Sequence, residues 1–131
     1  MPKILISDAM DNIAEKILIS NNIDVDVKTD FTVEELLVKI ERYDGLIVRS
    51  ATKVTKEIIE RAKNLKIIGR AGAGVDNIDL VAAKENKIIV MNTPGGNTNA
   101  TAEHTLALLM SLSRKISIAD SSTHKGEWAK K

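Results

Sequence analysis

The sequence GRAGAGVDNID, residues 69–79, follows an apolar run at residues 66–68 and precedes a segment with helical character, residues 80–85. A strand that ends in a glycine-rich turn and continues into a helix is a place where α/β proteins hold anionic groups, because the backbone approaches the ligand closely and its free N–H groups favour negative charge. Arg70 lies within the turn, and its planar guanidinium suits a carboxylate or a phosphate. This stretch therefore predicts an α/β fold with an anion site at the end of a strand.

The same turn carries only part of the dinucleotide-binding fingerprint G-x-G-x-x-G. Gly72 and Gly74 supply the first two glycines, but Asn77 stands where the third glycine lets the helix pack closely on the strand. The next apolar run, residues 88–92, ends in an amide rather than in the acidic residue that binds a ribose. The sequence therefore predicts an anion-binding turn here, and not a dinucleotide site.

Strand-like and helix-like segments alternate along the chain on both sides of this turn. Apolar runs predict strands at residues 3–7, 24–29, 46–48, 65–69 and 87–91, and amphipathic spacing predicts helices at residues 10–21, 33–42, 56–63 and 80–85. This alternation is typical of parallel sheets with right-handed crossovers. We expect a flavodoxin-like, parallel five-stranded sheet flanked by helices, with strand order 2-1-3-4-5.

Polar residues mark where these helices begin. Residues 32–35, TVEE, form a capping box before the second helix, and Thr55 is expected to cap the third. Asp79 or Asn77 is expected to cap the fourth helix. Asp8, at the exit of the first strand, is interpreted as a cap for the first helix.

A long apolar helix is predicted at residues 98–118, after a loop rich in turn residues. Its apolar stripe is wide, so it needs cover on more than one side. No later segment of the sequence supplies that cover. We therefore expect a domain at residues 1–97, a connecting helix and tail at residues 98–131, and a parent protein longer than this sequence.

Composition excludes several classes of function. The net charge of +1 gives no general attraction to nucleic acid or to anionic membranes, and no stretch has the length of a membrane span. The absence of cysteine excludes disulfides and thiolate chemistry and fits a cytoplasmic protein. No group of His, Asp and Glu has the spacing of a metal site. The expected partner is therefore a small anion bound locally.

Several segments together resemble the NAD-dependent D-2-hydroxyacid dehydrogenases. They are LISD (5–8), GLIVRSATKVT (45–55), IGRAGAGVDNID (68–79), VMNTPGGNTNATAEHTLALLM (90–110) and GEW (126–128). The resemblance implies that residues 1–97 form most of a substrate-binding domain and that the long helix leads to a Rossmann domain that binds NAD. It also implies that the catalytic arginine, glutamate and histidine lie outside this sequence, so that the sequence holds no catalytic residue and is inactive alone.

The resemblance further implies roles for individual residues. Arg49, Ser50 and Arg70 would bind the anionic groups of the substrate, and the turn Gly72–Gly74 would meet its carboxylate. Asn77 would orient these groups. Ala73 and Thr101 would lie on the cofactor side, and Lys130 would reach a phosphate. The substrate-binding set is Arg49, Ser50, Arg70, Gly72, Ala73, Gly74, Asn77 and Lys130, and the cofactor-binding set is Ala73 and Thr101.

The implied reaction is the oxidation of 3-phospho-D-glycerate to 3-phosphohydroxypyruvate with NAD, the first step of L-serine biosynthesis. Two alternatives stay open: a dehydrogenase for another D-2-hydroxy acid, and a free-standing, non-enzymatic module that binds an organic acid or a partner. Simpler roles also stay open for single residues, since Arg70 could pair with Asp76 or Asp79, and His104 is interpreted as a packing or interface residue. The helix at residues 98–118 is expected to form a homodimer or a larger assembly.

Overall fold

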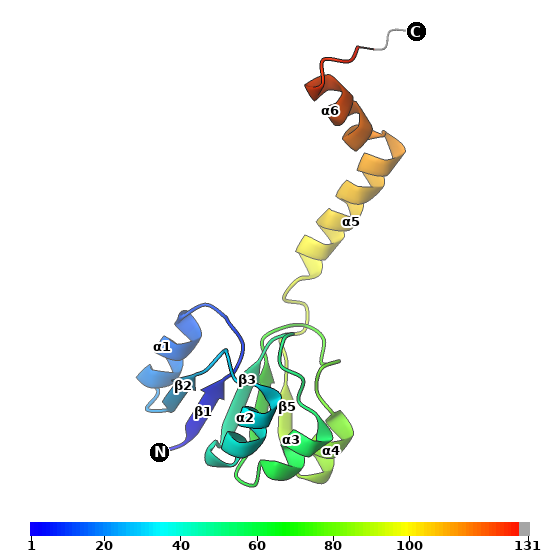
Figure 1. Cartoon of the computed structure of the whole chain (residues 1–131). Helices are drawn as coiled ribbons and strands as arrows, with labels where there is room; N and C mark the ends of the chain where they lie inside the picture. The colour runs from blue at the N-terminus through cyan, green and yellow to red at the C-terminus, as the bar shows by residue number, and fades with distance from the viewer. Residues whose placement is uncertain (129–131) are drawn as a thin grey trace. The chain divides into compact units, whose positions relative to one another are not determined.

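Five parallel strands form one sheet in the order β2-β1-β3-β4-β5 in the computed structural model, which describes residues 1–128 (Figure 1). The strands are β1 (Lys3–Ile6), β2 (Asp24–Val27), β3 (Gly45–Val48), β4 (Ile67–Arg70) and β5 (Ile89–Met91). The predicted α/β class, strand order and parallel pairing are confirmed, and β2 lies at an edge. Most strands are one or two residues shorter than predicted.

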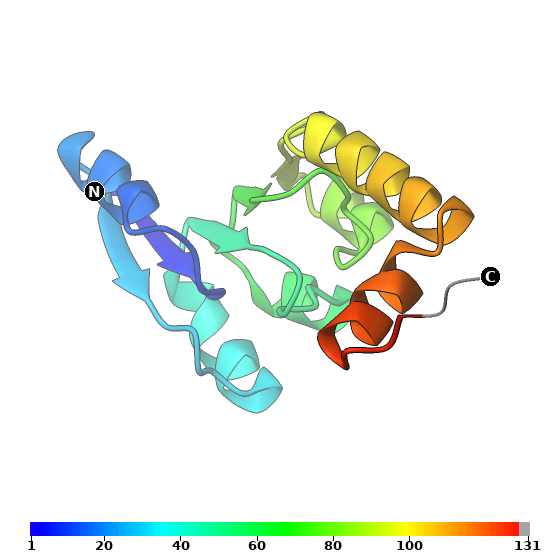
Figure 2. The same cartoon turned by 90° about the horizontal axis from the view of Figure 1, so that it is seen from above.

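Helices alternate with the strands in the first of two compact units, Met1–Gly96. They are α1 (Ile13–Ser20), α2 (Val33–Lys39) with a following 3₁₀ turn η1 (Ile40–Arg42), α3 (Lys56–Arg61) and α4 (Leu80–Glu85). The crossover through α1 runs in the opposite direction along the sheet from those through α2, α3 and α4. Because each crossover is right-handed, α1 covers one face and the other three helices cover the opposite face (Figure 2).

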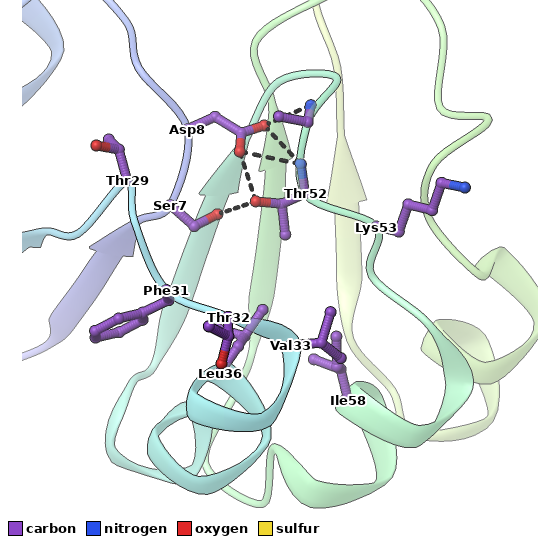
Figure 3. Close-up of a pocket in the computed structure, with 11 residues that line it drawn as sticks. Ser7, Asp8, Thr29, Phe31, Thr32, Val33, Leu36, Thr52, Lys53 and Ile58 are labelled. Carbon is purple, nitrogen blue, oxygen red and sulfur yellow. Dashed lines mark hydrogen bonds between the residues drawn. The ribbon is translucent and has the colours of Figure 1, made fainter.

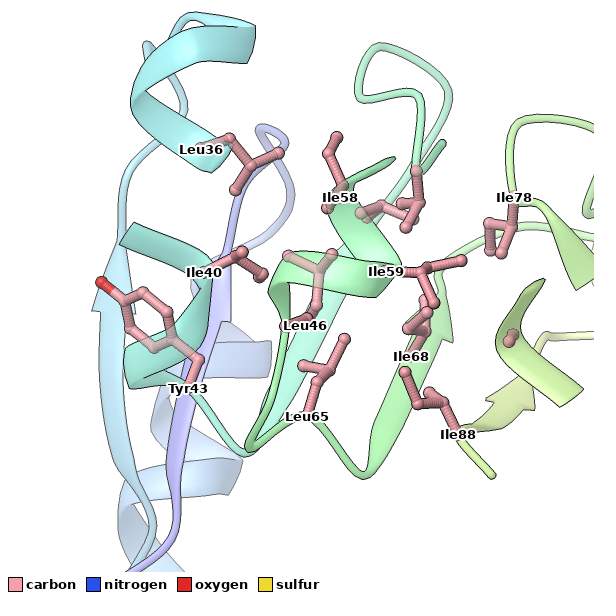
Figure 4. Packing of buried hydrophobic residues seen from close by; sticks show 14 of the residues in the cluster. Leu36, Ile40, Tyr43, Leu46, Ile58, Ile59, Leu65, Ile68, Ile78 and Ile88 are labelled. Carbon is pink, nitrogen blue, oxygen red and sulfur yellow. The ribbon is translucent and has the colours of Figure 1, made fainter. Parts of the chain in front are cut away.

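The hydrophobic core lies between the sheet and helices α2, α3 and α4 (Figure 4). Leu5, Leu46 and Ile68 point from neighbouring strands into this core and are fully buried, where they meet Ile58 and Ile59 of α3. Successive residues of a strand face opposite sides of the sheet. The strand residues next to Leu5, Leu46 and Ile68 therefore face away from this core. Ile58 and Ile59 form the buried stripe of α3, as the amphipathic spacing of residues 56–63 leads one to expect.

The predicted helix caps are confirmed in part. The capping box is confirmed, because the Glu35 N–H donates to Thr32 Oγ1 at 3.2 Å and the Thr32 N–H donates to Glu35 Oε2 at 3.0 Å. Asp79 caps α4 by accepting the Ala82 N–H at 2.9 Å. Thr55 is the N-cap residue of α3, as predicted, but its side chain makes no capping hydrogen bond.

The first helix is shorter and less buried than its sequence pattern predicts. It starts three residues later than expected, with the Ile13 N–H donating to the carboxylate of Asp11 at 2.9 Å. Ile13 and Ile17, two apolar residues of this amphipathic segment, are both more than half exposed. The amphipathic pattern therefore located this helix but did not predict how much of its stripe is covered.

The second unit, Asn97–Lys131, corrects the prediction of one helix over residues 98–118. Two helices occur instead, α5 (Thr98–Ser113) and α6 (Ile116–His124). Lys115 between them has a left-handed backbone with φ of 53°, which ends α5 because consecutive helical hydrogen bonds cannot continue through that conformation. Within the described residues, no helix has the length and apolar character needed to cross a bilayer.

Candidate functional site

Arg49 and Arg70 stand side by side at the carboxyl edge of the sheet. Arg49 follows β3, Arg70 is the last residue of β4, and the register pairs Val48 with Arg70. Nε of Arg70 donates to the Arg49 carbonyl oxygen at 3.3 Å. The carboxyl edge is where α/β sheets bind ligands. The structure therefore brings together the two arginines that the sequence singled out.

Asn77 joins the loops that carry these two arginines. Its Nδ2 donates to the carbonyl oxygens of Arg49 at 2.8 Å and Thr52 at 2.7 Å, while its Oδ1 accepts from Nε of Arg70 at 3.1 Å. The backbone adds a second link, since the Val54 N–H donates to the Asn77 carbonyl at 2.8 Å. The loops after β3 and β4 are thus fixed to each other at several points.

Gly72 leaves room for the guanidinium of Arg70. A Cβ placed on Gly72 would lie 2.5 Å from Nη1 of Arg70, which is far inside contact distance. The Arg70 side chain is only 13% exposed, and its ion pair with Asp76 is long, at 3.9 Å, to a carboxylate that is 87% exposed. Exposed pairs of this kind contribute little. Asp79, the other expected partner, is occupied as the cap of α4.

The turn after β4 presents unused backbone donors beside Arg70. Among the described residues, the N–H groups of Ala73 and Gly74 donate no hydrogen bond within the protein, and neither does that of Ser50. The turn itself is anchored, because Nδ2 of Asn92 donates to the Ala73 carbonyl at 2.7 Å and the Thr93 N–H donates to the Gly72 carbonyl at 3.0 Å. A fixed turn with free N–H groups next to a guanidinium can bind an anion.

Asp8 is a part of this region that the sequence interpretation missed, and its assignment as a helix cap is wrong. Its carboxylate points toward the loop after β3 (Figure 3) and accepts the N–H groups of Arg49 at 2.6 Å, Ala51 at 3.2 Å and Thr52 at 3.0 Å. The Thr52 hydroxyl donates to the same carboxylate at 2.5 Å. The topology carried a signal for this role, because the chain leaves β1 toward β2 on one side while β3 lies on the other, which makes the β1–β3 boundary the switch point of the sheet.

The environment of Asp8 favours the charged form of its carboxyl. Asp8 is only 5% exposed, and this burial alone would raise its pKa. The hydrogen bonds from the Thr52 hydroxyl and from the N–H groups of Arg49, Thr52 and Ala51 outweigh burial and hold the pKa of Asp8 below its usual range. Asp8 therefore carries a negative charge at neutral pH, which the loop after β3 solvates.

Two hollows adjoin the region. A pocket of about 250 Å³ lies below Asp8 and Thr52 and is walled by Phe31, Leu36 and Ile58 (Figure 3). A broader depression of about 720 Å³ borders Ser50 and Asn77 and has further lining from residues 53–56. The arginine loops thus stand at the rim of a hollow rather than on a flat surface.

The other predicted site residues do not belong to the unit Met1–Gly96 that carries this edge. Thr101 belongs to α5 in the second unit, where its carbonyl accepts the Thr105 hydroxyl at 2.7 Å, and His104 is exposed on the same helix. Lys130 lies outside the described residues. Within residues 1–128, no group of three or more His, Cys, Asp or Glu side chains could hold a metal ion.

Comparison with known proteins places this chain in one family. Residues 4–127 match the family described as D-isomer specific 2-hydroxyacid dehydrogenase, catalytic domain. The chain belongs to this family. The predicted resemblance is thereby confirmed.

The chain is also similar to individual proteins. The chain is 48% identical over 129 residues to D-3-phosphoglycerate dehydrogenase of Archaeoglobus fulgidus, covering 98% of this chain and 24% of that protein. A crystal structure of a protein from Pyrococcus horikoshii matches 99% of this chain and 39% of its own, with 38% identity and a TM-score of 0.84. The NAD⁺-bound 3-phosphoglycerate dehydrogenase of Entamoeba histolytica matches 84% of this chain and 38% of its own, with 38% identity and a TM-score of 0.72.

The chain spans about a quarter of the length of the relatives that it matches in sequence. Its similarity to them includes the whole region that carries Arg49, Arg70 and Asn77. What these relatives do as whole proteins is therefore a proposal for this chain.

Proposed function

We propose that this chain holds the anionic substrate in an NAD-dependent dehydrogenase that oxidises 3-phospho-D-glycerate to 3-phosphohydroxypyruvate, the first step of L-serine biosynthesis. The observation that carries the proposal is the pair of arginines at the ends of β3 and β4, joined through Asn77. The relatives named D-3-phosphoglycerate dehydrogenase support the same substrate. The cytoplasmic location and an assembly through the predicted helix stay predictions.

The substrate carries two anionic groups, a carboxylate and a phosphate. The free N–H groups of Ala73 and Gly74 and the guanidinium of Arg70 suit the carboxylate, because a planar fork and parallel N–H donors match its two oxygens. Arg49 is exposed at the neighbouring strand end and suits the phosphate. These groups would fix the substrate in one orientation, which is how a binding domain accelerates a reaction between two bound molecules.

The residues of this region could form only a small part of an NAD site. The turn has Asn77 in place of the third glycine of the dinucleotide fingerprint, and the Asn77 side chain is committed to Arg49, Thr52 and Arg70. We therefore assign to the turn at Ala73 no more than contact with the cofactor, with most of the NAD site elsewhere in the protein. When bound, NAD accepts the hydride that leaves the substrate carbon, while the residues of this chain bind and orient that substrate.

Replacement of Arg70 tests the proposal in the protein expressed from its complete natural gene. Arg70→Ala should raise KM for 3-phospho-D-glycerate at least about tenfold, since a charge-assisted bidentate contact contributes about 1.4 kcal/mol or more. Arg70→Lys should recover only part of the loss, because an ammonium lacks the fork. Arg42→Ala, at an exposed arginine of η1, is the matched control. Unchanged KM and kcat in Arg70→Ala would refute the assignment.

The size of the natural protein separates the enzyme from a free-standing binding module. An antibody to residues 1–96 should detect a species of two to three domains in source cells, on the scale of about 100–200 residues per domain. A species at the 14.3 kDa of this sequence would contradict the proposal that the chain acts within a longer dehydrogenase, and would favour the non-enzymatic module.

A phosphorylated substrate is the specific part of the proposal. If Arg49 binds the phosphate, Arg49→Ala should weaken the binding of 3-phospho-D-glycerate strongly and the binding of D-glycerate little. Equal losses for both acids would assign Arg49 to the carboxylate, and the alternative of a different D-2-hydroxy acid would then be favoured.

A further inference from the structure

The segment of Arg49–Thr52 after β3 is held from two sides by groups of opposite character. The Asp8 carboxylate accepts its N–H groups, from Arg49, Ala51 and Thr52, while the Asn77 amide donates to its carbonyl oxygens, at Arg49 and Thr52. Both partners come from other elements, Asp8 from the exit of β1 and Asn77 from the loop before α4. The segment therefore has little freedom to change its conformation without losing several hydrogen bonds.

The residue next to Asp8 also directs the Arg49 side chain. Nη1 of Arg49 donates to the Ala9 carbonyl at 3.0 Å. The exit of β1 thus fixes Arg49 twice, through its backbone N–H and through its guanidinium. The two remaining guanidinium nitrogens, Nη2 and Nε, and the free Ser50 N–H stay available for a ligand.

The charge of Asp8 calls for an explanation beyond loop stability. Among the described residues, no Lys, Arg or His side-chain nitrogen lies within ion-pair distance of its carboxylate. The charge is therefore solvated by neutral donors alone, namely backbone N–H groups and the Thr52 hydroxyl. A buried carboxylate close to an anion site repels that anion, which by itself weakens binding. Its presence there is consistent with a gain in positioning that exceeds the electrostatic loss.

We propose that Asp8 is a positioning residue of the anion site, which holds the Arg49–Ser50 segment in the conformation that binds the substrate. This inference rests on the proposed function, since it names how one of its two arginines is set in place. It gives Asp8 no contact with the substrate and no part in proton transfer.

Two explanations of the charge on Asp8 predict changes of opposite sign in Kd when Asp8 is replaced by Asn. If the charge acts only through space, its removal strengthens the binding of an anion. If Asp8 positions Arg49, the amide places an NH₂ group against backbone N–H donors, the segment moves, and binding weakens. The sign of the change in Kd therefore separates the two.

The experiment is a double-mutant cycle in the protein expressed from its complete natural gene, with Kd for 3-phospho-D-glycerate measured by isothermal titration calorimetry. Asp8→Asn and Arg49→Ala should each raise Kd about tenfold. The double variant should stay within about twofold of Arg49→Ala, because a residue that acts through Arg49 adds nothing once Arg49 is gone. Asp30→Asn, an exposed carboxylate with no hydrogen-bond partner among the described residues, is the matched control and should leave Kd unchanged.

Hydrogen exchange supplies a readout that needs no ligand. In Asp8→Asn, the amides of Arg49 and Thr52 should exchange at least about tenfold faster, while the Leu5 amide in β1 should keep its rate. If Asp8→Asn does not fold, Thr52→Val removes one donor to the carboxylate and should raise Kd in the same direction by a smaller factor.

The outcomes that overturn the inference differ from those that overturn the proposed function. If Arg49→Ala raises Kd but Asp8→Asn leaves it unchanged or lowers it, the positioning role is refuted and the proposed function stands. Losses that multiply in the double variant also refute the role, because Asp8 would then act independently of Arg49. If neither Arg49→Ala nor Arg70→Ala changes Kd, the proposed function itself fails.

Discussion

The side-chain oxygen of Asn77 accepts a hydrogen bond from Nε of Arg70, with 3.1 Å between the two atoms. The same side chain donates from Nδ2 to the carbonyls of Arg49 and Thr52, so that one amide serves both arginine loops. The geometry agrees with the orienting role expected for Asn77. The sequence motif marks this residue as a missing glycine, but the structure uses it as a link.

Asn77→Ala should therefore destabilise the chain and loosen the site together. Three hydrogen bonds are lost at a half-buried position, and the free energy of unfolding should fall by about 1–3 kcal/mol. Urea unfolding followed by circular dichroism measures this change. Asn64→Ala, which removes one exposed side-chain hydrogen bond to the Glu41 carbonyl, is the control and should lose less. Equal losses in the two variants would show that the link through Asn77 contributes nothing special.

Gly72→Ala should displace the guanidinium of Arg70 rather than unfold the protein. The added Cβ would lie 2.5 Å from Nη1 of Arg70, and that atom is the end of a flexible side chain that can move. We expect weaker binding of 3-phospho-D-glycerate, by about the same factor as Arg70→Ala, with little change in urea unfolding. Gly69→Ala is the control, since its Cβ would meet only Ile47 Cγ1 at an ordinary 3.7 Å. Unchanged binding in Gly72→Ala would mean that Arg70 works from another rotamer.

The fold could be predicted from the sequence because its signals are local and repeated. Strand and helix patterns alternate five times, and right-handed crossovers then leave few possible strand orders. The break at Lys115 could not be predicted in this way, since neither glycine nor proline marks it and a lysine in the left-handed region has no sequence signature. The exposure of Ile13 and Ile17 was equally hidden, because a periodic stripe does not tell how much of it is covered.

The candidate site could be predicted only where residues follow strands directly. Arg49 and Arg70 end adjacent strands, so the sheet order alone brings them together. Asp8 was misread because an acidic residue before a helix has an ordinary local role as a cap. Its actual partners lie about 40 residues away along the chain, and only the pairing of β1 with β3 brings them to it.

The stability that Asp8 contributes should depend on pH in a defined direction. Burial raises the pKa of Asp8, but hydrogen bonds from Thr52, Arg49 and Ala51 lower it by more than burial raises it. The folded pKa therefore lies below the unfolded value of about 3.9. A group of this kind stabilises the fold fully above the unfolded pKa and loses that contribution as pH falls through the folded pKa. The difference in unfolding free energy between wild type and Asp8→Asn should therefore be constant from about pH 5 to 7 and shrink below about pH 4.

Urea unfolding of both proteins over this pH range measures the difference, which removes the effect of other carboxylates that titrate in both. Asp26 and Asp44 also have lowered pKa values and contribute equally to the two curves. A difference that stays constant to the lowest pH would mean that Asp8 is not ionised in the folded chain.

Tyr43, the single tyrosine of the sequence, gives a direct optical test of the structure beside the edge strand β2. Burial and the hydrogen bond that its hydroxyl donates to Asp26 at 2.8 Å raise the pKa of Tyr43 to about 12. Tyrosinate absorbance should therefore appear with a midpoint near pH 12 in the native chain and near the ordinary value of about 10 in urea.

The sign for stability follows from this raised pKa. The contribution of Tyr43 is complete below about pH 10 and is lost as pH rises through about 12, so wild type should lose its advantage over Tyr43→Phe in that window. Asp26→Asn should lower the native midpoint only in part, because burial is the larger cause and remains. If the native and urea midpoints coincide, the Tyr43 hydroxyl is solvated in the folded chain, and the hydrogen bond from Tyr43 to Asp26 of β2 does not form.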